Sequence, residues 1–287
     1  MTVVEAFAPA KINLALHVTG RREDGYHLLD SIVAFADYGD TVVVRPSETL
    51  NLTIEGPFGQ GLEPDENNLV LRAARFLDPA GTAEITLVKR LPVASGIGGG
   101  SADAAAALRA LSALWSVSLP PAETCAALGA DVPVCLISAF SRMSGIGDEI
   151  SPLGDAPDLD IVLINPGVAV PTSAIFKGLA RKDNVPMSAT VPASGTGRWL
   201  DWLRDQRNDL EAPAIAAEPV IAEVLEELCG MPDCRLARMS GSGATCFALF
   251  ERGRTPLSAV EAIKAHHPEW WVTPTQLTLE QPSVKTL

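Results

Sequence analysis

Positive charge is scarce in this sequence, and the scarcity excludes partners that depend on it. Lys and Arg number 22 against 35 Asp and Glu, which gives a formal net charge of −13 at pH 7. Proteins that bind the phosphate backbone of nucleic acids do so with many Lys and Arg side chains. We therefore expect no nucleic-acid partner, whereas a small anionic substrate needs only a few local cations and stays compatible with this composition.

Long apolar stretches and clustered metal ligands are missing as well. No run of about 18 apolar residues occurs, so we expect no membrane span. The start, MTVVEAFAPAKIN, has neither the charged beginning nor the long apolar core of a secretory signal. The five cysteines are scattered and form no CxxC pair, which favours reduced thiols in a cytoplasmic protein over zinc ligands or disulfides.

Glycine, in contrast, is concentrated in one informative segment. Residues 92–111 read PVASGIGGGSADAAAALRAL, and Gly98, Gly99 and Gly100 come directly before Ser101 and an alanine-rich helix. Glycine adopts positive φ without strain, so such a loop can turn its N–H groups inward around an anion. The helix start adds unpaired N–H groups and the positive end of its dipole. Because the preceding ITLVKRL run predicts a strand, this order of elements predicts a phosphate-binding loop.

The two best-known loops of this kind do not fit the residues. A Walker loop has lysine before its Ser or Thr, but Gly100 precedes Ser101 here. The dinucleotide fingerprint would have glycine in place of Ser101, and an acidic residue at a set distance that this sequence lacks. A flexible surface turn before an ordinary helix is the remaining alternative. The pattern favours a phosphate donor bound by a non-Walker loop.

The apolar pattern predicts an α+β fold in two parts. In residues 11–18 apolar side chains alternate with Lys11, Asn13 and His17, which predicts a strand with these three on one face. Other strands are expected at 41–45, 50–55, 83–89, 161–164, 235–239, 245–250 and 270–277, helices at 68–77, 101–115, 121–129, 173–180, 198–206, 219–229 and 256–266, and a mobile loop at 183–197. The proline-rich stretch 151–160 marks a boundary, so we predict domains at residues 1–155 and 156–287. The element order after the boundary favours a split βαβ layer.

Three further motifs accompany the glycine loop. They are PAKINL at 9–14, GADVP at 129–133 and MSGSGA at 239–244. In this order and spacing the four motifs closely resemble the GHMP kinases, the small-molecule kinases of galactose, homoserine, mevalonate and phosphomevalonate. The resemblance covers residues 8 to about 250. It implies a two-domain GHMP-kinase architecture, with an N-terminal mixed α/β nucleotide lobe, a C-terminal ferredoxin-like split βαβ lobe, and ATP and substrate in the cleft between them.

The resemblance also implies which residues form the site. The family's ATP loop falls on Pro92, Val93, Ala94, Ser95, Gly96, Ile97, Gly98, Gly99, Gly100, Ser101 and Ala102, and its adenine-side contacts fall on Asn68 and Lys89. Lys11 and Asp131 correspond to the catalytic pair. Within the family the resemblance is to members that act on a cytidine diphosphate-linked alcohol: Asn13, Tyr26 and His27 fall where these recognise the cytidine diphosphate, Phe176 matches the aromatic that stacks on cytosine, and Thr172 lies nearby. Mg²⁺ is expected to accompany ATP, with Ser101 as the candidate protein ligand.

The chemistry of phosphoryl transfer suits the catalytic pair. Such enzymes mainly position the reactants and stabilise charge. The carboxylate of Asp131 can accept the proton of an attacking hydroxyl, and general-base help is worth about 10²–10⁴ in rate. Lys11 would keep that carboxylate ionised and stabilise the moving phosphoryl group. Without the motifs, Lys11 would pass for a solvated lysine at the end of a strand, and Asp131 for a turn residue before Pro133.

Other positions leave two interpretations open. Tyr26 and His27 suit a pyrimidine through stacking and edge hydrogen bonds, or they are plain loop residues. MSGSGA is either a second glycine loop on the nucleotide side or a bend of small residues between two strands. Asp103, so near the expected phosphates, must point away from them or help to hold Mg²⁺. Ala94 and Ser95 stand where the family usually has glycine.

The resemblance implies an ATP-dependent, cytoplasmic kinase of the non-mevalonate route to isoprenoid precursors. Its expected acceptor is the 2-hydroxyl of a cytidine diphosphate-linked methylerythritol. One rival is a kinase of mevalonate-type or homoserine-type alcohols, against which GRREDGYH and Phe176 count because they suit a nucleobase. The other rival is a non-catalytic nucleotide or sugar sensor, against which the presence of both Lys11 and Asp131 counts.

Overall fold

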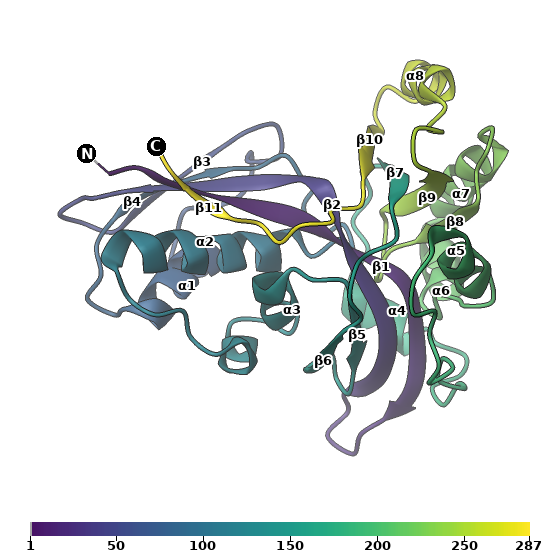
Figure 1. Ribbon diagram of the computed structural model, residues 1–287, viewed down its shortest axis with the longest axis horizontal. Helices are drawn as coiled ribbons and strands as arrows, with labels where there is room; N and C mark the ends of the chain where they lie inside the picture. Colours follow the sequence, from purple (N-terminus) through teal and green to yellow (C-terminus); the bar gives the residue numbers. More distant parts are fainter. Residues whose placement is uncertain (1) are drawn as a thin grey trace.

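Two long antiparallel strands form the centre of the molecule. In the computed structural model, which describes residues 2–287, β1 (Val4–Arg21) pairs with β2 (His27–Arg45). Figure 1 shows both strands running from the N-terminal lobe into the C-terminal lobe. Val4, Ala6 and Ala8 lie in the core of the first lobe, whereas Leu16 and Val18 lie in the core of the second. The strand predicted at 11–18 is therefore the middle of a much longer one.

The N-terminal lobe is built on a 7-stranded mixed sheet. Its strand order is β11-β1-β2-β4-β3, and a β5–β6 hairpin joins it through β2. These strands are β3 (Asn51–Glu55), β4 (Glu84–Val88), β5 (Ser141–Ser144), β6 (Glu149–Pro152) and β11 (Val284–Thr286). Only β3 and β4 pair in parallel among the described strands of this sheet, and all other pairs are antiparallel.

Two helices cover one face of this sheet. α1 (Leu69–Leu77) begins at Asn68, whose side chain accepts a hydrogen bond from the backbone N–H of Val70 at 3.0 Å. α2 (Gly99–Trp115) is rich in alanine, the residue that best favours a helix, and the small side chains let it lie buried against the strands. Both helices agree with the sequence prediction, and together they position the glycine loop at the start of α2 (Figure 1).

The segment after α2 differs from the prediction. The helix expected at 121–129 is a short 3₁₀ helix, η1 (Ala122–Ala127), and Pro120 and Pro121 directly precede it. Next comes α3 (Val132–Ile137), which the sequence did not indicate because VPVCLI has the apolar, branched composition of a strand. Pro133 lies in the first turn of α3, where its missing N–H costs nothing. This helix fixes Asp131 at its N-cap position.

The C-terminal lobe contains a 4-stranded antiparallel sheet. Its strands are β7 (Leu159–Asn165), β8 (Leu236–Met239), β9 (Cys246–Glu251) and β10 (Trp271–Gln276). They are arranged in the order β10-β7-β9-β8. The first and second strands of the lobe are therefore parallel, with the third between them, which is the split βαβ arrangement. The ferredoxin-like prediction is confirmed.

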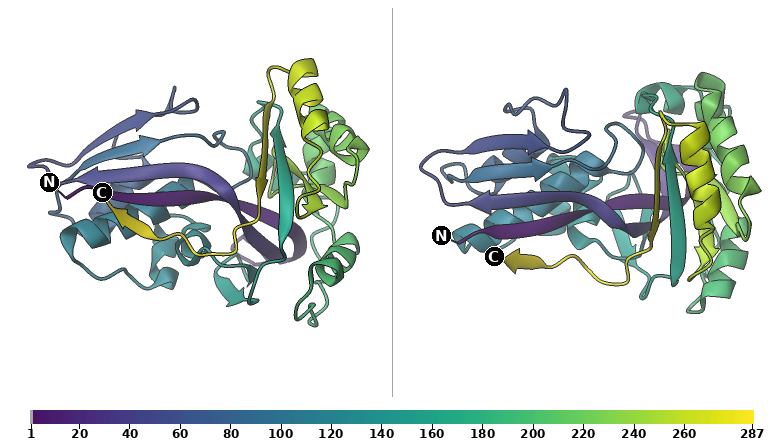
Figure 2. Two further views of the ribbon diagram at one scale, coloured as in Figure 1. Left: turned by 45° about the horizontal axis from the view of Figure 1, so that its top comes forward. Right: turned by 90° about the horizontal axis from the view of Figure 1, so that it is seen from above.

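Five helices surround this sheet: α4 (Thr172–Lys177), α5 (Thr196–Arg204), α6 (Glu211–Ala217), α7 (Val220–Gly230) and α8 (Leu257–His266). Figure 2 shows α7 and α8 on the face turned away from the N-terminal sheet. The opposite face packs on α5 and on the middle of β1, including Ile12 and Leu14. The sequence did not predict α6, whose segment EAPAIAA contains a proline. Residues 178–195 form neither helix nor strand, and the mobility expected for 183–197 stays a prediction.

The two ends of the chain lie side by side. β11 pairs with Val4–Ala6 at the edge of the first sheet, so the last strand belongs to the sheet that the first strand begins (Figures 1 and 2). The division into domains at residue 155 stays a prediction. Among the residues described, no helix is both long and apolar enough to cross a bilayer.

Candidate functional site

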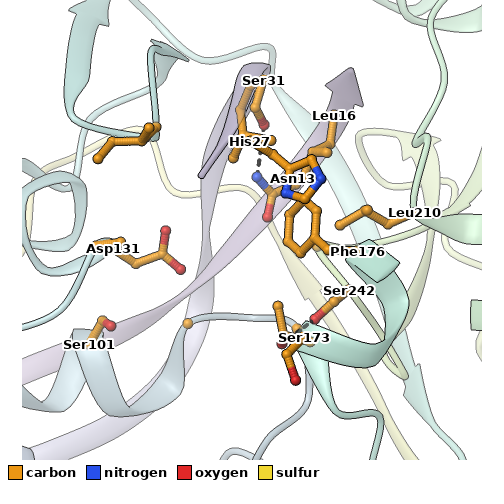
Figure 3. Close-up of a pocket in the computed structure, with 18 of the residues that line it drawn as sticks. Asn13, Leu16, His27, Ser31, Ser101, Asp131, Ser173, Phe176, Leu210 and Ser242 are labelled. Carbon is orange, nitrogen blue, oxygen red and sulfur yellow. Dashed lines mark hydrogen bonds between the residues drawn. The ribbon is translucent and has the colours of Figure 1, made fainter. Parts of the chain in front are cut away.

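A cleft of about 830 Å³ lies where the two lobes meet. Its walls come from β1, the start of β2, the glycine loop, the start of α3, and α4. Figure 3 shows Asn13 and His27 facing Asp131, Ser173 and Ser242 across this space. The predicted site residues that line it are Lys11, Asn13, Tyr26, His27, Ala94, Ser95, Gly96, Gly98, Gly99, Gly100, Ser101, Asp131, Thr172 and Phe176.

A β-bulge determines which residues of β1 reach the cleft. Lys11 and Asn13 line it, as the two-residue period predicts. The register of β1 against β2 shifts between Asn13 and Ala15, and beyond the shift Leu16 lines the cleft. His17 does not: its ring lies within hydrogen-bond distance of the Val185 carbonyl and the Arg207 N–H. The prediction that His17 shares a face with Lys11 is wrong because the inserted residue reverses the alternation.

Lys11 and Asp131 form an ion pair inside the cleft. Their Nζ and Oδ2 atoms are 2.7 Å apart. The Lys11 side chain is 6% exposed, whereas that of Asp131 is 36% exposed, so the carboxylate keeps a free side toward the cleft. The backbone N–H of Lys11 donates to the Ile97 carbonyl at 3.0 Å, which ties this strand to the glycine loop. Lys11 is therefore held in place by its buried surroundings and its backbone contact, and the carboxylate of Asp131 stays accessible from the cleft.

The glycine loop winds through left-handed backbone conformations. Ala94, Gly96 and Gly98 have φ of 52°, 76° and 64°. Gly98 is the N-cap of α2 and has no side chain, so the N–H groups that follow it are open to an anion. Ile97 and Ala102 are buried in the core and do not line the cleft. The side chains of these two residues therefore do not reach the cleft.

The MSGSGA segment packs directly against the first glycine loop. A Cβ atom added to Gly96 would lie 2.4 Å from the carbonyl oxygen of Ser240, and one added to Gly241 would lie 2.6 Å from that of Gly96. Ser240 Oγ donates to the Gly96 carbonyl at 3.1 Å and accepts from the backbone N–H of Asn13 at 3.0 Å. This buried hydroxyl links both loops to β1, and the nucleotide contact of the second loop stays a prediction.

The other end of the cleft holds the residues expected to bind cytidine. The rings of His27 and Phe176 stack with centroids 4.7 Å apart and planes 23° apart. Tyr26 is 61% exposed beside them. Burial lowers the pKa of His27, and the positive charges of Arg21 and Lys182 lower it further. The imidazole is therefore neutral at pH 7. The Oγ atoms of Thr172 and Ser242 lie 2.8 Å apart and connect α4 to the second loop.

A second cavity of about 240 Å³ adjoins the glycine loop. It is lined by the remaining predicted ATP-side residues, Asn68, Lys89, Pro92 and Val93, and it shares Ala94, Gly99 and Gly100 with the main cleft. Lys89 is only 3% exposed there, and its ammonium forms ion pairs with Asp40 and, at 2.9 Å, with Asp103. Its Nζ thus contacts two carboxyl groups, so Lys89 contributes to the cavity wall mainly through the apolar part of its side chain.

This buried cluster resolves the position of Asp103. Its Oδ2 accepts from Lys89, so the side chain is directed to the lysine and not to the expected phosphates. Burial raises the pKa of Asp103 to about 8; Lys89 opposes the rise and Asp40 adds to it. Burial lowers the pKa of Lys89, but the carboxylates of Asp103 and Asp40 outweigh it and the net change is upward. In this arrangement the Oδ2 atom of Asp103 is engaged by Lys89, and a role of Asp103 toward Mg²⁺ stays a prediction.

Metal ligands are sparse in the part of the chain that the structure describes. Across residues 2–287, no three His, Cys, Asp or Glu side chains are grouped so as to hold a metal ion. Ser101 lies at the start of α2, lines the cleft and presents a hydroxyl oxygen, the kind of donor that Mg²⁺ accepts. A site with Ser101 as its one candidate protein ligand fits a magnesium ion that is held mainly by phosphate oxygens.

Among the residues that the sequence did not indicate, Arg21, Ser31 and Lys177 line the cleft, and the buried Ser240 adjoins it. Arg21 and Lys177 line the cleft and supply positive charge. Ser31 hydrogen-bonds Asn13, and Ser240 joins the loops. Arg21, Lys177 and Ser240 lie within the recognised motifs or beside them, so a closer reading could have found them. Ser31 belongs to no motif, and only the pairing of β1 with β2 reveals it.

Comparisons with known proteins agree with this geometry. The family model described as GHMP kinases N terminal domain matches residues 68–141, and the one described as GHMP kinases C terminal matches residues 193–269. A protein of Ruegeria pomeroyi named 4-diphosphocytidyl-2-C-methyl-D-erythritol kinase is 56% identical over 276 residues, covering 93% of this chain and 97% of its own. A protein of the same name from Paramagnetospirillum magneticum is 48% identical and covers 96% and 99%.

Solved structures give the same result. A crystal structure of 4-(cytidine 5'-diphospho)-2C-methyl-D-erythritol kinase superposes with a TM-score of 0.77 and 32% identity, covering 96% of this chain and 99% of that one. A homoserine kinase from Cytophaga hutchinsonii superposes with a TM-score of 0.71, but at 20% identity it supports the fold alone.

Proposed function

The chain belongs to the GHMP kinase family, and from this premise we propose that it transfers the γ-phosphoryl group of ATP to the 2-hydroxyl of 4-diphosphocytidyl-2-C-methyl-D-erythritol. The observation that carries the proposal is the Lys11–Asp131 pair, which lies in one cleft with a glycine loop and with the His27–Phe176 stack. The relatives that cover nearly the whole chain bear the name of this kinase, which supports the choice of substrate.

The chemistry assigns each member of the pair one task. The acceptor hydroxyl oxygen attacks the γ-phosphorus, the bond from that phosphorus to the β–γ bridging oxygen breaks, and ADP leaves with the electron pair. The proton of the hydroxyl passes to the carboxylate of Asp131. Lys11 holds that carboxylate in place at 2.7 Å and offsets the negative charge that spreads over the transferred group. The products are ADP and a phosphate monoester.

The nucleotide is expected at the start of α2. N–H groups of the loop and of the helix start would hold the phosphates, with the helix dipole in support. The adjoining cavity, with Asn68 and Lys89 in its wall, would take the base. Mg²⁺ would enter with ATP and neutralise charge on its β and γ oxygens, with Ser101 as the protein ligand.

The acceptor would occupy the rest of the cleft. Its cytosine would stack on Phe176 near Tyr26, with the neutral His27 as hydrogen-bond partner. Thr172 lies beside this end and Asn13 between it and the catalytic pair. The cations Arg21 and Lys177, in a chain of net charge −13, suit the diphosphate of the substrate. A cytoplasmic location is part of the same proposal.

A substrate panel with coupled detection of ADP tests the proposal. We expect ADP release with the cytidylylated methylerythritol and ATP in the presence of Mg²⁺, and none with mevalonate or homoserine. Turnover of mevalonate or homoserine in its place would reassign the acceptor. No turnover with any alcohol of the panel, together with tight nucleotide binding, would point to a sensor and remove the kinase assignment.

A further inference from the structure

The side-chain amide of Asn13 has one orientation, fixed by a hydroxyl on the neighbouring strand. Asn13 Nδ2 donates to Ser31 Oγ at 2.8 Å, and Ser31 Oγ donates to the Ala15 carbonyl at 2.7 Å. A serine hydroxyl has a single proton, and here Ala15 receives it. Ser31 can therefore only accept from Asn13, so the amide must present its NH₂ group to Ser31. Figure 3 shows this bond as a dashed line, with the amide oxygen turned the other way.

The amide oxygen is consequently left as a free acceptor. Asn13 is 3% exposed, and among residues 2–287 its Oδ1 has no hydrogen-bond partner. A buried acceptor without a partner costs about 1–3 kcal/mol, so its occurrence in a cleft indicates a group that a ligand satisfies. The ligand group must be a hydrogen-bond donor. A phosphate oxygen without a proton would be repelled, so the NH₂-to-Ser31 orientation excludes phosphate as the partner of Asn13.

The position of Asn13 on β1 suggests which donor it meets. Asn13 and Lys11 are two residues apart on one strand face, a separation of about 6.6–6.8 Å. Lys11 is paired with Asp131, the proposed base for the reacting hydroxyl. We propose that Ser31 is a positioning residue, which keeps Asn13 Oδ1 turned to the cleft so that it accepts a hydrogen bond from a hydroxyl of the acceptor alcohol on a carbon next to the one phosphorylated. This inference rests on the proposed function, which names that alcohol.

Kinetics of four variants test the role of Ser31. Loss of one neutral hydrogen bond, about 0.5–1.5 kcal/mol, corresponds to a factor of about 2–12. We expect Asn13→Ala to raise KM for the alcohol by about 10-fold and leave KM for ATP unchanged. Ser31→Ala should raise it less, about 3-fold, because the released amide rotates. Ser31→Thr keeps the hydroxyl and should restore wild-type KM. Ser31→Ala added to Asn13→Ala should have no further effect.

The matched control is a buried serine on the adjacent strand β5. Ser141 is 0% exposed and donates to the Ala139 carbonyl at 2.9 Å, but it does not line the cleft. Ser141→Ala should leave both KM values unchanged. If Ser31→Ala raises KM for the alcohol by the same factor in the wild-type enzyme and in the Asn13→Ala variant, the Ser31 hydroxyl acts independently of the Asn13 amide. The proposal would then be wrong. Where Ser31→Ala lowers the melting temperature too far for assay, Ser31→Thr and the substrate analogue below decide.

Substrate analogues test the class of donor. With the wild-type enzyme, an analogue that lacks one hydroxyl beside the reacting carbon should have a kcat/KM about 10-fold below that of the complete substrate. With Asn13→Ala, the analogue and the complete substrate should have equal kcat/KM. If a uridine counterpart, which lacks the cytosine amino group, shows that pattern instead, Asn13 faces the base and the proposal is wrong. If the wild-type enzyme does not phosphorylate the cytidylylated alcohol, the proposed function is wrong. The Asn13→Ala, Ser31→Ala and double variants are then compared with the alcohol that the enzyme does phosphorylate.

Discussion

Lys11 and Asp131 lie within 2.7 Å of each other although one belongs to the first strand and the other precedes a helix far along the chain. The contact exists because α3 places Asp131 at its N-cap and because the register of β1 is regular from Lys11 to Asn13, so both of these side chains lie on the face of the strand that lines the cleft. The geometry of the proposed catalytic pair thus depends on two local features of the backbone.

Removal of the carboxylate tests the proposed base. Asp131→Asn keeps the shape of the side chain and the helix start, but an amide cannot accept the hydroxyl proton. We expect kcat to fall by a factor of about 10²–10⁴ with KM for ATP nearly unchanged. Steady-state kinetics with ADP detection measure both. Asp183→Asn, in an exposed surface ion pair, serves as the control and should have no effect. Near-normal turnover of Asp131→Asn would refute the base assignment.

The contact between the two glycine loops predicts the cost of one methyl group. Gly96 has φ of 76°, and an added Cβ would meet the Ser240 carbonyl at 2.4 Å. We expect Gly96→Ala to lower the free energy of unfolding by about 1–3 kcal/mol and to raise KM for ATP at least about 10-fold. Gly197 in α5 has no neighbour within 4 Å, and Gly197→Ala should stabilise the protein by up to about 1 kcal/mol. Equal melting temperatures for the two variants would contradict this account.

The lowered pKa of His27 predicts how substrate affinity varies with pH. The neutral imidazole persists below its ordinary pKa of 6.5 because burial and the charges of Arg21 and Lys182 oppose protonation. We expect KM for the cytidylated substrate to stay level from about pH 8 to pH 6.5 and to rise at lower pH as His27 gains a proton. His27→Ala should raise KM at every pH and abolish the rise. If His27→Ala weakened the binding of ATP as much as that of the cytidylylated substrate, the assignment of His27 to the cytidine end of the cleft would be wrong.

The buried Asp103 predicts a dependence of stability on pH. Its pKa is raised from 3.8 to about 8, so the folded state holds a proton that the unfolded state releases between these values. The stability contributed by this carboxyl is complete below about pH 4 and is lost as pH rises toward 8. Asp103→Asn cannot lose a proton. Its melting temperature relative to wild type should therefore be higher at pH 8.5 than at pH 5.5, and a constant difference would contradict the raised pKa.

The sequence predicted most helices and strands, but it did not predict where the pairing of two strands interrupts the alternation of side chains. The glycine loop, α1 with its Asn68 cap, and the split βαβ sheet follow from composition and periodicity. His17 was misplaced because a bulge arises from how two strands pair, which a single strand's pattern does not reveal.

The candidate site shows the same division. Lys11, Asn13, Asp131 and Phe176 meet in one cleft as the motifs predicted. Ser31 escaped notice because its importance depends on its hydrogen bond to Asn13 across the strand pair. The contacts of Lys89 with Asp40 and Asp103 likewise join three segments that are distant in the sequence, so no local pattern predicts them. Contacts between segments of this kind lie beyond what a local sequence pattern contains.

The long strand β1 contributes buried side chains to all three apolar clusters: Val4, Ala6 and Ala8 to one, Ile12 and Leu14 to another, and Leu16 and Val18 to the third. One continuous strand therefore takes part in all three cores of the described residues. Because the loss of this strand would disrupt every one of these cores, we expect them to unfold together in a single calorimetric peak on heating.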